Sequence, residues 1–358
     1  MNPLATLIHR EIETKGGIPV DRFMELCLSH PEHGYYIKRD PFGAKGDFTT
    51  APEISQMFGE MIGLWLISTW DQLGRPERFN LVELGPGRGT LMADVLRVAK
   101  TMSGFLQGAE ISLMETSPTL RDAQKETLKD ASPTWITSVT ELQDLPTLLI
   151  ANEFFDALPV KQFQRIGDVW LERIVKTRDN QLEFGLRNTQ SREHLPIMSD
   201  GTILERSSIG TSLFSQISAQ IERSSGAALI FDYGGVNGSG DTLQAVKDHA
   251  FCDPFETPGD ADLTVHVDFA QLAGHLNSCQ GHLTTQGQFL TAMGIHERAR
   301  VLGKGRDETR QETIKTALNR LTGEDEMGTL FKTMAVTRGN APPPLGFEVK
   351  DAPEPDQS

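Results

Sequence analysis

Residues 79–89, Phe-Asn-Leu-Val-Glu-Leu-Gly-Pro-Gly-Arg-Gly, join an apolar run to three glycines at alternate positions. The apolar run predicts a buried strand. Residues 90–100, Thr-Leu-Met-Ala-Asp-Val-Leu-Arg-Val-Ala-Lys, predict a helix that begins directly after the glycines. A strand, a glycine turn and a helix N-terminus form the nucleotide-binding unit of doubly wound α/β folds. The stretch therefore predicts a Rossmann-like sheet with a ligand at the turn.

The glycine spacing and the acid before it distinguish between two nucleotide-like ligands. A dinucleotide fingerprint reads G-x-G-x-x-G, whereas this turn reads G-x-G-x-G and Glu83 stands two residues before its first glycine. A carboxylate there would repel a pyrophosphate but attract an ammonium or sulfonium group, and S-adenosylmethionine (SAM) carries both. Glu83, Gly85, Pro86, Gly87 and Gly89 are therefore predicted to bind SAM. The alternative is a turn that only joins a strand to a helix.

A second acid follows the next strand-like run, residues 109–114. Glu115 stands at the end of this run, and Ser117-Pro118 then predicts the start of another helix. In nucleotide-binding α/β folds an acid in this place hydrogen-bonds the ribose hydroxyls, so Glu115 is predicted to bind the SAM ribose. The other interpretation is an acid that complements the dipole of the following helix, and both can hold together.

Composition narrows the class of partner. The chain has 358 residues, of which 38% are hydrophobic, and a formal net charge of −15. Because nucleic-acid binding depends mainly on neutralising phosphates, this charge argues against a nucleic-acid partner and favours a cationic substrate. Three widely spaced cysteines (Cys27, Cys252 and Cys279) indicate neither a disulfide framework nor a metal site.

The sequence also carries expectations about membranes and location. No stretch approaches the roughly 20 apolar residues that span a bilayer, so we expect no membrane insertion. The N-terminal residues lack the features of a signal or transit peptide, which predicts a cytoplasmic, bacterial protein. A mitochondrial matrix location would require a transit peptide beyond this sequence. A homodimer is left open.

Strand-like and helical runs alternate between residues 79 and 151, which predicts a parallel sheet. The N-terminal region is expected to be helical at 4–15 and 20–29, and Thr50–Glu53 reads as a capping box that opens a helix over 54–70. The expected organisation is a helical N-terminal region or lid (1–75), the first part of the Rossmann-like domain (76–161), an insertion of antiparallel strands and a helix on the substrate side (162–225), the second part of that domain (226–340) and a disordered tail (341–358).

The stretch Ala151-Asn-Glu-Phe-Phe-Asp-Ala-Leu-Pro159 follows the fourth predicted strand. Ligands of doubly wound sheets bind at the carboxyl ends of strands, so Asn152, Glu153 and Asp156 are expected to face the crevice of the glycine turn. The two acids could hold a cationic substrate while Phe154 and Phe155 shield the transfer path from water. The alternative is a polar loop whose two rings pack in the core.

Three further motifs are candidates for the same crevice. Residues 46–56 could form a lid over the SAM pocket through Asp47, Phe48, Ser55 and Gln56. Asp232-Tyr-Gly-Gly235 ends the fifth predicted strand and is also expected there. His266 and Asp268 could serve acid–base chemistry or a metal, but a structural hydrogen bond between them is the favoured interpretation. No hydrolase, zinc-protease or NTPase motif is present.

Between about residues 16 and 338 the chain resembles the MidA-like class I SAM-dependent methyltransferases. The motifs that carry the resemblance are Ser29–Tyr36, Gly46–Gln56, Glu83–Leu91, Ala151–Pro159, Pro258–Thr264 with Val267–Phe269, and Thr285–Gly287. The resemblance implies a doubly wound, seven-stranded methyltransferase sheet and SAM at the glycine motif. Its mitochondrial members assist assembly of respiratory complex I and symmetrically dimethylate an arginine on a core subunit.

The resemblance therefore implies an enzyme that methylates arginine on a protein substrate, such as a complex I core subunit. Asn152 is expected to contact both SAM and the reacting groups, beside Glu153 and Asp156. The rival class is a non-catalytic SAM-binding assembly factor with the same pocket. A second rival, an NAD-linked oxidoreductase, is disfavoured by the glycine spacing.

Overall fold

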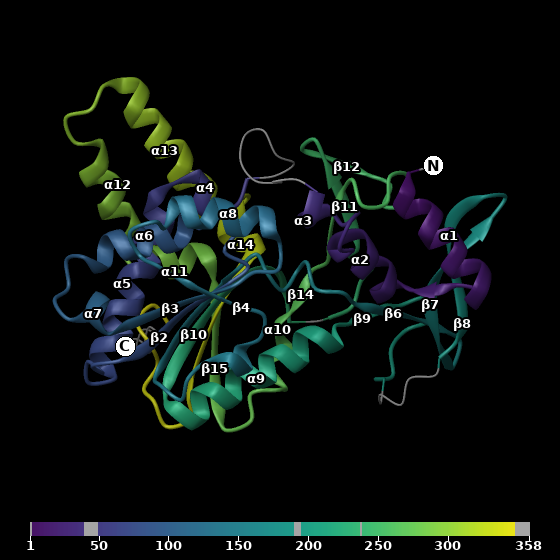
Figure 1. Ribbon diagram of the computed structural model, residues 1–358, viewed down its shortest axis with the longest axis horizontal. Helices are drawn as coiled ribbons and strands as arrows, with labels where there is room; N and C mark the ends of the chain where they lie inside the picture. The colour runs from purple at the N-terminus through teal and green to yellow at the C-terminus, as the bar shows by residue number, and fades with distance from the viewer. Residues whose placement is uncertain (1, 39–48, 190–194, 237, 348–358) are drawn as a thin grey trace, which may run out of the picture.

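The computed structural model describes residues 2–38, 49–189, 195–236 and 238–347 (Figure 1). Its centre is a mixed sheet of eight strands. Along the sheet the order is β15 (Cys279–Thr285), β16 (Phe331–Arg338), β10 (Gly226–Gly235), β5 (Thr147–Asn152), β2 (Phe79–Leu84), β3 (Ala109–Met114) and β4 (Thr134–Ile136). The strands from β4 to β10 run parallel, and β16 is antiparallel to both of its neighbours.

The prediction of an α/β fold with a largely parallel sheet is confirmed. The sheet has one strand more than the predicted seven, because the two-residue β14 (Val267–Asp268) pairs in parallel with the end of β10. This addition prolongs the sheet at the carboxyl ends of its parallel strands, which is the edge where a ligand is expected.

Helices cover both faces of the sheet, because side chains of a strand alternate between faces. Leu81 and Leu229 belong to one core, and Val82 and Ile230 belong to the other. The first core is closed by α4 (Ala51–Ile54), α5 (Gln56–Gln72), α6 (Thr90–Ala99), α7 (Phe105–Gly108), α11 (Gln286–Ala292), α12 (Ile295–Gly303), α13 (Glu308–Thr322) and α14 (Met327–Leu330). The second is closed by the 3-10 turn η1 (Val139–Glu141), α9 (Ser208–Ser224) and α10 (Phe269–Ala273).

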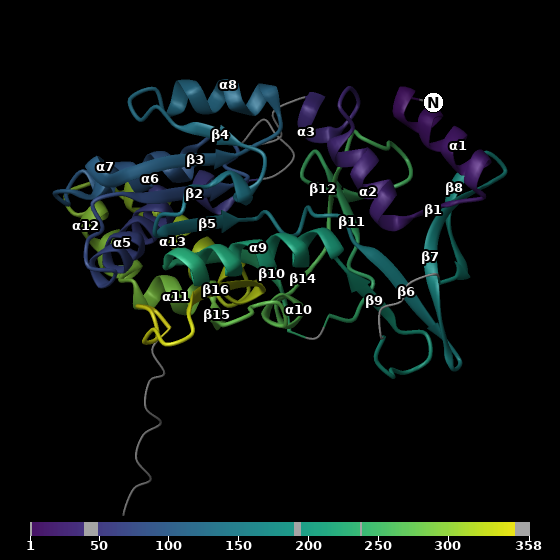
Figure 2. The ribbon, with the colours of Figure 1, turned by 60° about the horizontal axis from the view of Figure 1, so that its bottom comes forward.

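A second sheet lies at the far end of the molecule (Figure 2). It consists of β1 (Ile18–Pro19), β7 (Val169–Arg178), β6 (Lys161–Ile166) and β9 (Ile203–Arg206), with β8 (Gln181–Asn188) paired to β7. The helices α1 (Pro3–Lys15) and α2 (Val20–Ser29) share its apolar core, and the short α3 (Tyr35–Lys38) follows them. The N-terminal helices and the inserted strand β7 therefore contribute side chains to one shared apolar core.

A small sheet connects this layer to the central one. It has the order β12 (Ala250–Cys252), β11 (Gln244–Lys247) and β13 (Asp262–Thr264), and residues of β11 and β13 belong to the same core as α1 and α2. Neither this sheet nor β9 is predicted from the sequence, because strands of three or four residues leave too short a pattern of alternation.

The start of the long helix differs from the prediction. The Thr50 side chain caps nothing at α4, and the Glu53 carboxylate accepts a hydrogen bond from Thr90 Oγ1 at 2.6 Å instead of completing a capping box. The chain then breaks at Ser55, whose hydroxyl caps α5 by accepting from the Met57 N–H. Glu53, which the sequence predicts to be part of a helix cap, thus ties the N-terminal segment to the helix that follows the glycine turn.

Two glycines of α5, Gly59 and Gly63, lie close to α6. A Cβ built on Gly59 would lie 2.5 Å from Asp94 Cβ on α6, and one on Gly63 would lie 3.2 Å from Val98 Cβ. These small residues therefore let α5 and α6 pack at short range.

The described part of the expected disordered tail is ordered. Trp65 Nε1 donates to the Leu345 carbonyl at 3.1 Å, and Phe347 is buried against Phe289. Disorder was expected from the polar, proline-rich composition of this segment, but Phe347 packs its ring in the core and so holds the segment in place. Residues 348–358 lie outside the described part of the chain.

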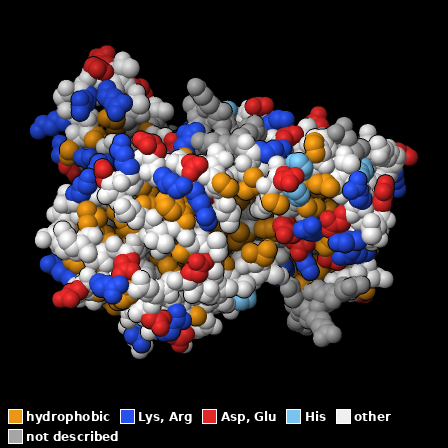
Figure 3. Space-filling view, in the orientation of Figure 1, with side chains coloured by type: hydrophobic (Ala, Val, Ile, Leu, Met, Phe, Trp, Pro, Cys, Tyr) orange, Lys and Arg blue, Asp and Glu red, His pale blue; other side chains and the backbone are white. Residues whose placement is uncertain are grey.

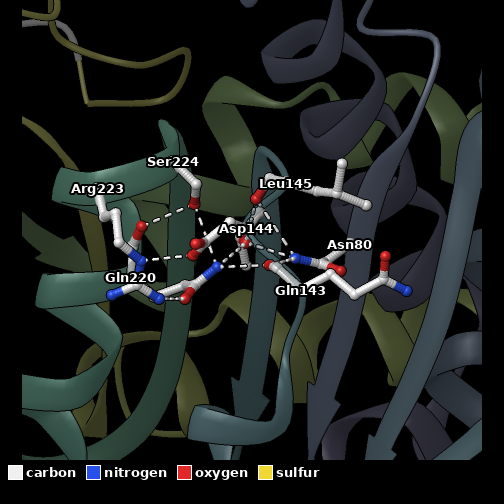
Figure 4. Close-up of polar contacts among 8 residues, drawn as sticks. Asn80, Gln143, Asp144, Leu145, Gln220, Arg223 and Ser224 are labelled. Carbon is white, nitrogen blue, oxygen red and sulfur yellow. Dashed lines mark hydrogen bonds and ion pairs between the residues drawn. The ribbon is translucent and has the colours of Figure 1, made fainter.

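A polar network closes the amino-terminal ends of the central strands (Figure 4). Asn80 Nδ2 donates to the carbonyls of Gln143 and Leu145 and to Thr147 Oγ1, and Gln220 Nε2 of α9 donates to the same Gln143 carbonyl. Because these bonds satisfy groups at the edge opposite to the glycine turn, they hold the sheet together and leave its carboxyl edge for ligands.

Candidate active site

Four parallel strands end in polar residues at one edge of the sheet. The residues are Glu83 in β2, Glu115 after β3, Asn152 in β5 and Asp232 in β10. A cavity of about 490 Å³ opens at this edge, and a smaller one of about 40 Å³ adjoins it at Gly85, Gly87 and Glu153. The structure therefore brings the residues predicted from separate motifs to one place.

The glycine turn adopts a backbone that other residues rarely take. Gly85, Gly87 and Gly89 have φ values of +59°, +53° and +81°. This left-handed region costs a residue with a Cβ free energy, whereas glycine enters it freely. A Cβ on Gly85 would also lie 2.6 Å from the Phe154 ring. The turn thus brings the backbone of Gly85 and Gly87 to the wall of both cavities, just before the start of α6.

Glu83 is a buried acid with an unused acceptor. Its side chain is 2% exposed, and burial raises its pKa to about 8 against the opposing hydrogen bond from the Met92 N–H. Within the described residues, Glu83 Oε2 has no hydrogen-bond partner. A buried carboxylate oxygen without a donor is costly, and an ammonium group in the smaller cavity would satisfy it.

Asn152 offers a second acceptor to the same cavity. Its Nδ2 donates to Glu153 Oε1 at 3.1 Å, while Oδ1 is buried and has no partner in the described part of the chain. Two orphaned oxygens, one from β2 and one from β5, suit a group with several N–H donors. The amino group of SAM is such a group, so the residues present fit the cofactor.

Glu115 is held rigidly at the wall of the larger cavity. Its Oε1 accepts from the N–H groups of Thr116 and Ser117 at 2.7 and 2.8 Å, and its Oε2 accepts from Gln124 Nε2 at 3.3 Å. Burial raises the pKa of Glu115 despite these bonds. Glu115 therefore fixes the backbone just before α8 (Pro118–Thr127), whose N-cap is Ser117, and it lines the cavity, while ribose binding stays a prediction.

Gln124 is a residue that sequence reasoning missed. It is fully buried on α8, and its Nε2 donates both to the Gly87 carbonyl at 2.7 Å and to Glu115. It thereby fixes the glycine turn relative to the predicted ribose acid. A glutamine on the apolar side of a helix could have indicated a buried hydrogen-bonding residue, but the sequence does not show which groups it bonds.

Asp232 is fully buried and lines neither cavity, whereas its neighbour Tyr233 lines the larger one, and Asp232 instead organises the loop after β5. Its Oδ2 accepts from the backbone N–H groups of Phe154, Phe155 and Asp156 at 3.2, 2.8 and 3.3 Å. Burial, and then the nearby Glu153, raises its pKa to about 8. Phe155 packs in the core, as expected if the loop were only structural. Phe154 instead lines the cavity, as expected if its ring shielded the bound groups from water.

Glu153 lies where the two cavities meet. It has the left-handed φ of +50°, which a residue other than glycine adopts only under constraint. Its Oε1 accepts from the Ala51 N–H at 2.9 Å as well as from Asn152, and burial raises its pKa to about 7. This acid therefore connects the end of β5 to the first turn of α4.

Asp156 completes a group of buried acids. Burial, followed by the charges of Asp232, Asp262 and Glu153, raises its pKa well above the ordinary value. Asp262 was not selected from the sequence, although it lies in the 258–264 motif. Its partner is the Tyr36 hydroxyl, which donates to Asp262 Oδ1 at 2.9 Å, and both residues line the cavity.

The remaining candidates are the residues of the expected lid and the pair His266 and Asp268. Asp47 and Phe48 lie outside the described residues. Gln56 does not line either cavity at the sheet edge, and its Nε2 donates to Glu60 within α5. The predicted hydrogen bond between His266 and Asp268 is wrong, because Asp268 caps α10 by accepting from two backbone N–H groups and the His266 ring packs on Tyr233.

A largely parallel α/β sheet whose carboxyl edge carries a glycine turn, and whose orphaned buried oxygens fit the amino group of SAM, indicates a SAM-dependent methyltransferase. The match of a family model described as S-adenosyl-L-methionine-dependent methyltransferase over residues 61–288 agrees with this class. The chain belongs to that family, and its cofactor is SAM.

Curated relatives and a solved structure support the same assignment. The chain is 38% identical to the mitochondrial protein arginine methyltransferase NDUFAF7 homolog of Drosophila melanogaster, over 94% of this chain and 85% of the relative. It is 34% identical to the Homo sapiens NDUFAF7, over 94% and 84%. A Burkholderia thailandensis protein solved with S-adenosyl-homocysteine has a TM-score of 0.82 at 26% identity, over 96% and 94% of the two chains.

In the part of the chain that the structure describes, no helix has both the length and the apolar character needed to cross a membrane.

Proposed function

We propose that this methyltransferase transfers the methyl group of SAM to an arginine side chain of a protein. The observation that carries the proposal is the group of acids that line the larger cavity, Glu153, Asp156 and Asp262, which suits a cation. The relatives named above are called protein arginine methyltransferases, which supports the same substrate class. The net charge of −15 also favours approach of a basic segment.

The proposed SAM site uses the residues predicted from the sequence. Glu83 and Asn152 accept hydrogen bonds from the amino group, and Glu115 accepts from the ribose hydroxyls. The turn with Gly85, Pro86, Gly87 and Gly89 approaches the cofactor with its backbone. The orphaned oxygens of Glu83 and Asn152 support this orientation.

The proposed reaction is an in-line displacement. SAM supplies a methyl carbon whose bond to sulfur breaks as the bond to an arginine nitrogen forms, and the sulfur keeps the bonding electrons. Glu153 and Asp156 orient the guanidinium and draw its positive charge away from the attacking nitrogen. The proton that leaves this nitrogen passes to one of these carboxylates, whose pKa values are raised by burial.

Finer features of the reaction and of the chain's organisation stay predictions. They are symmetric dimethylation, a respiratory complex I core subunit as acceptor, the five-part division of the chain, a homodimer and a cytoplasmic location. The relatives carry the word mitochondrial in their names, which supports the mitochondrial matrix as the alternative location.

One experiment tests the reaction class. The purified full-length chain is incubated with methyl-labelled SAM and a lysate of its own cells lacking the chain, and the labelled residue is located by mass spectrometry. We expect label on arginine, and none with the Gly87→Val variant described below. Label on another residue type contradicts the arginine assignment, and SAM binding without any transfer supports the non-catalytic assembly factor.

A further inference from the structure

The larger cavity extends beyond the proposed SAM site. Gly87 and Glu115 line it on the side of β2 and β3, where the cofactor is proposed to bind. On the side of β10 it is lined by Tyr36, Asp156 and Asp262, which come from α3, the loop after β5, and β13. The second part is therefore built by elements outside the strand–turn–helix unit, and the cofactor site does not account for it.

The acids in this second part are buried and close to one another. Asp156 is 6% exposed and Asp262 is 5% exposed. The charges of Asp156 and Asp262 both contribute to raising the pKa of Tyr36, which places the three groups together. Burying carboxylates side by side costs free energy that a bound cation recovers.

The mouth of the cavity is apolar and exposed. Phe251 on β12 is 77% exposed and Leu330 at the end of α14 is 51% exposed, and both line the cavity. Hydrophobic side chains gather in the middle of the face drawn in Figure 3. Folding alone gives no reason to expose a phenylalanine beside a cavity, whereas contact with an apolar chain segment does.

This order of surfaces, apolar at the mouth and acidic inside, matches one kind of side chain. We propose, on the basis of the proposed function, that the acceptor arginine passes Phe251 and Leu330 with its methylene stem and places its guanidinium between Asp156 and Asp262. The Tyr36 hydroxyl is a positioning group, since its hydrogen bond fixes Asp262 Oδ1. Asp262 is thereby a specificity-determining residue contributed from outside the SAM-binding motifs.

The arrangement favours arginine over lysine. A guanidinium presents five N–H donors in a plane, so carboxylates from two different elements can each accept from a different edge. An ammonium group offers three donors at a single point and cannot reach both carboxylates with the same geometry. The neutral isostere citrulline has the shape of arginine but lacks the charge that the buried acids require.

Binding is the first test, because it does not depend on catalysis. The full-length chain with S-adenosylhomocysteine is titrated calorimetrically with the peptide Gly-Gly-Arg-Gly-Gly and with its lysine and citrulline counterparts. We expect the arginine peptide to bind most tightly. Asp262→Asn keeps an acceptor for Tyr36 and should weaken the arginine peptide by roughly tenfold to a hundredfold, the cost of one charge-assisted hydrogen bond. S-adenosylhomocysteine affinity should not change.

Two matched variants control for structure. Glu205→Gln alters a buried acid that accepts a hydroxyl hydrogen bond from Thr242 in a separate cavity, and it should bind the arginine peptide like the wild type. Phe251→Ser should weaken the peptide, whereas Ile197→Ser, at a residue 93% exposed and away from the cavity, should not. Equal binding of the citrulline or lysine peptide, or unchanged binding by Asp262→Asn, overturns the assignment, as does a wild-type chain that binds no arginine peptide.

Transfer of labelled methyl to the same peptide separates this inference from the proposed function. If the wild type transfers the methyl group and Asp262→Asn does so with a higher KM for the peptide, the result supports both the proposed function and the acceptor subsite. Transfer with equal KM in the two proteins overturns the role of Asp262 and leaves the proposed function intact. Binding of the arginine peptide without transfer overturns the proposed function and leaves the acceptor subsite intact.

Discussion

The two parts of the active-site cavity are built in different ways. Except for Asn152 of β5, the proposed cofactor part comes from consecutive elements, β2 to α8, so the acids Glu83 and Glu115 and the glycine turn lie within one short stretch of sequence. The acceptor part joins Tyr36, Asp156 and Asp262, which are far apart in the chain. A contiguous motif can be read from one sequence, whereas a surface assembled from three elements becomes visible only after folding.

The same difference separates the structural basis of SAM binding from the structural basis of acceptor binding. The cofactor part is determined by backbone conformation and by acids whose hydrogen bonds are local. The acceptor part depends on how the N-terminal helices and the small sheet pack over the central one. Substitutions in the first part should therefore affect SAM binding, and substitutions in the second should affect the acceptor alone.

The largest expected effect is loss of SAM binding in Gly87→Val. Gly87 has φ +53° and lines both cavities, so a branched side chain would be strained and would occupy the space of the cofactor. Calorimetry should detect no SAM binding to the variant and no NAD binding to either form.

Gly74→Val is the matched control. Gly74 has φ +83° after α5, and a Cβ there meets nothing within 4 Å. The control should lose a comparable amount of stability and keep its SAM affinity. Unchanged SAM affinity in Gly87→Val would remove the basis for placing the cofactor at this turn.

Glu153→Gln should slow methyl transfer by roughly a hundredfold while SAM affinity is retained. The amide oxygen can still accept from the Ala51 N–H, so the loop keeps its shape and only the charge is lost. Steady-state transfer of labelled methyl to the acceptor, with SAM titration in parallel, measures both quantities.

The control for this variant is again Glu205→Gln, which neutralises a buried acid in the separate cavity and should transfer at the wild-type rate. If Glu153→Gln also transfers normally, Glu153 serves the loop and α4 only. Asp156 then becomes the proton acceptor to test.

Glu115→Ala should weaken SAM binding by about 1–3 kcal/mol, because the ribose hydroxyls lose a charged acceptor. Glu115→Gln sharpens the interpretation. Its remaining oxygen can accept from the Thr116 and Ser117 N–H groups, so it should preserve the melting temperature better than alanine does. A large fall in melting temperature with unchanged SAM affinity in the alanine variant would leave Glu115 as a helix cap alone.

The smallest expected effect is the release of a proton when SAM binds. Burial raises the pKa of Glu83 to about 8, so this carboxyl group is largely protonated near neutral pH when no ligand is bound. An ammonium group binds the ionised form, so SAM binding should release a proton and strengthen as the pH rises toward that value. Calorimetry in two buffers of different ionisation enthalpy measures the release, which Glu83→Gln should abolish.

The raised pKa of Glu83 also determines whether the free energy of unfolding of the ligand-free protein rises or falls with pH. A carboxyl group whose folded pKa is raised holds its proton longer in the folded state than in the unfolded state. The free energy of unfolding should therefore fall as the pH rises from about 4.5 to about 8, the ordinary and raised pKa values of Glu83. Stability that rises over this range, measured by chemical denaturation, would contradict burial of an uncompensated acid.

Much of the fold could be predicted because the central strands are apolar runs followed by helical patterns. Glu83 and Glu115 were found for the same reason, since strand ends mark the ligand edge of a parallel sheet. The break at Ser55 was missed because the helical pattern continues on both sides of it. Asp262 and Gln124 were missed because their importance depends on partners that only tertiary packing brings near.

The position of β16 has a consequence for how the chain is made. Residues 331–338 are among the last of the sheet to leave the ribosome, yet they pair with β10 on one side and β15 on the other. Until they arrive, the nascent chain carries a sheet whose inner edge has unpaired backbone groups, which is a surface that other chains can join. Demand for chaperones during synthesis should therefore fall sharply only when this strand is inserted.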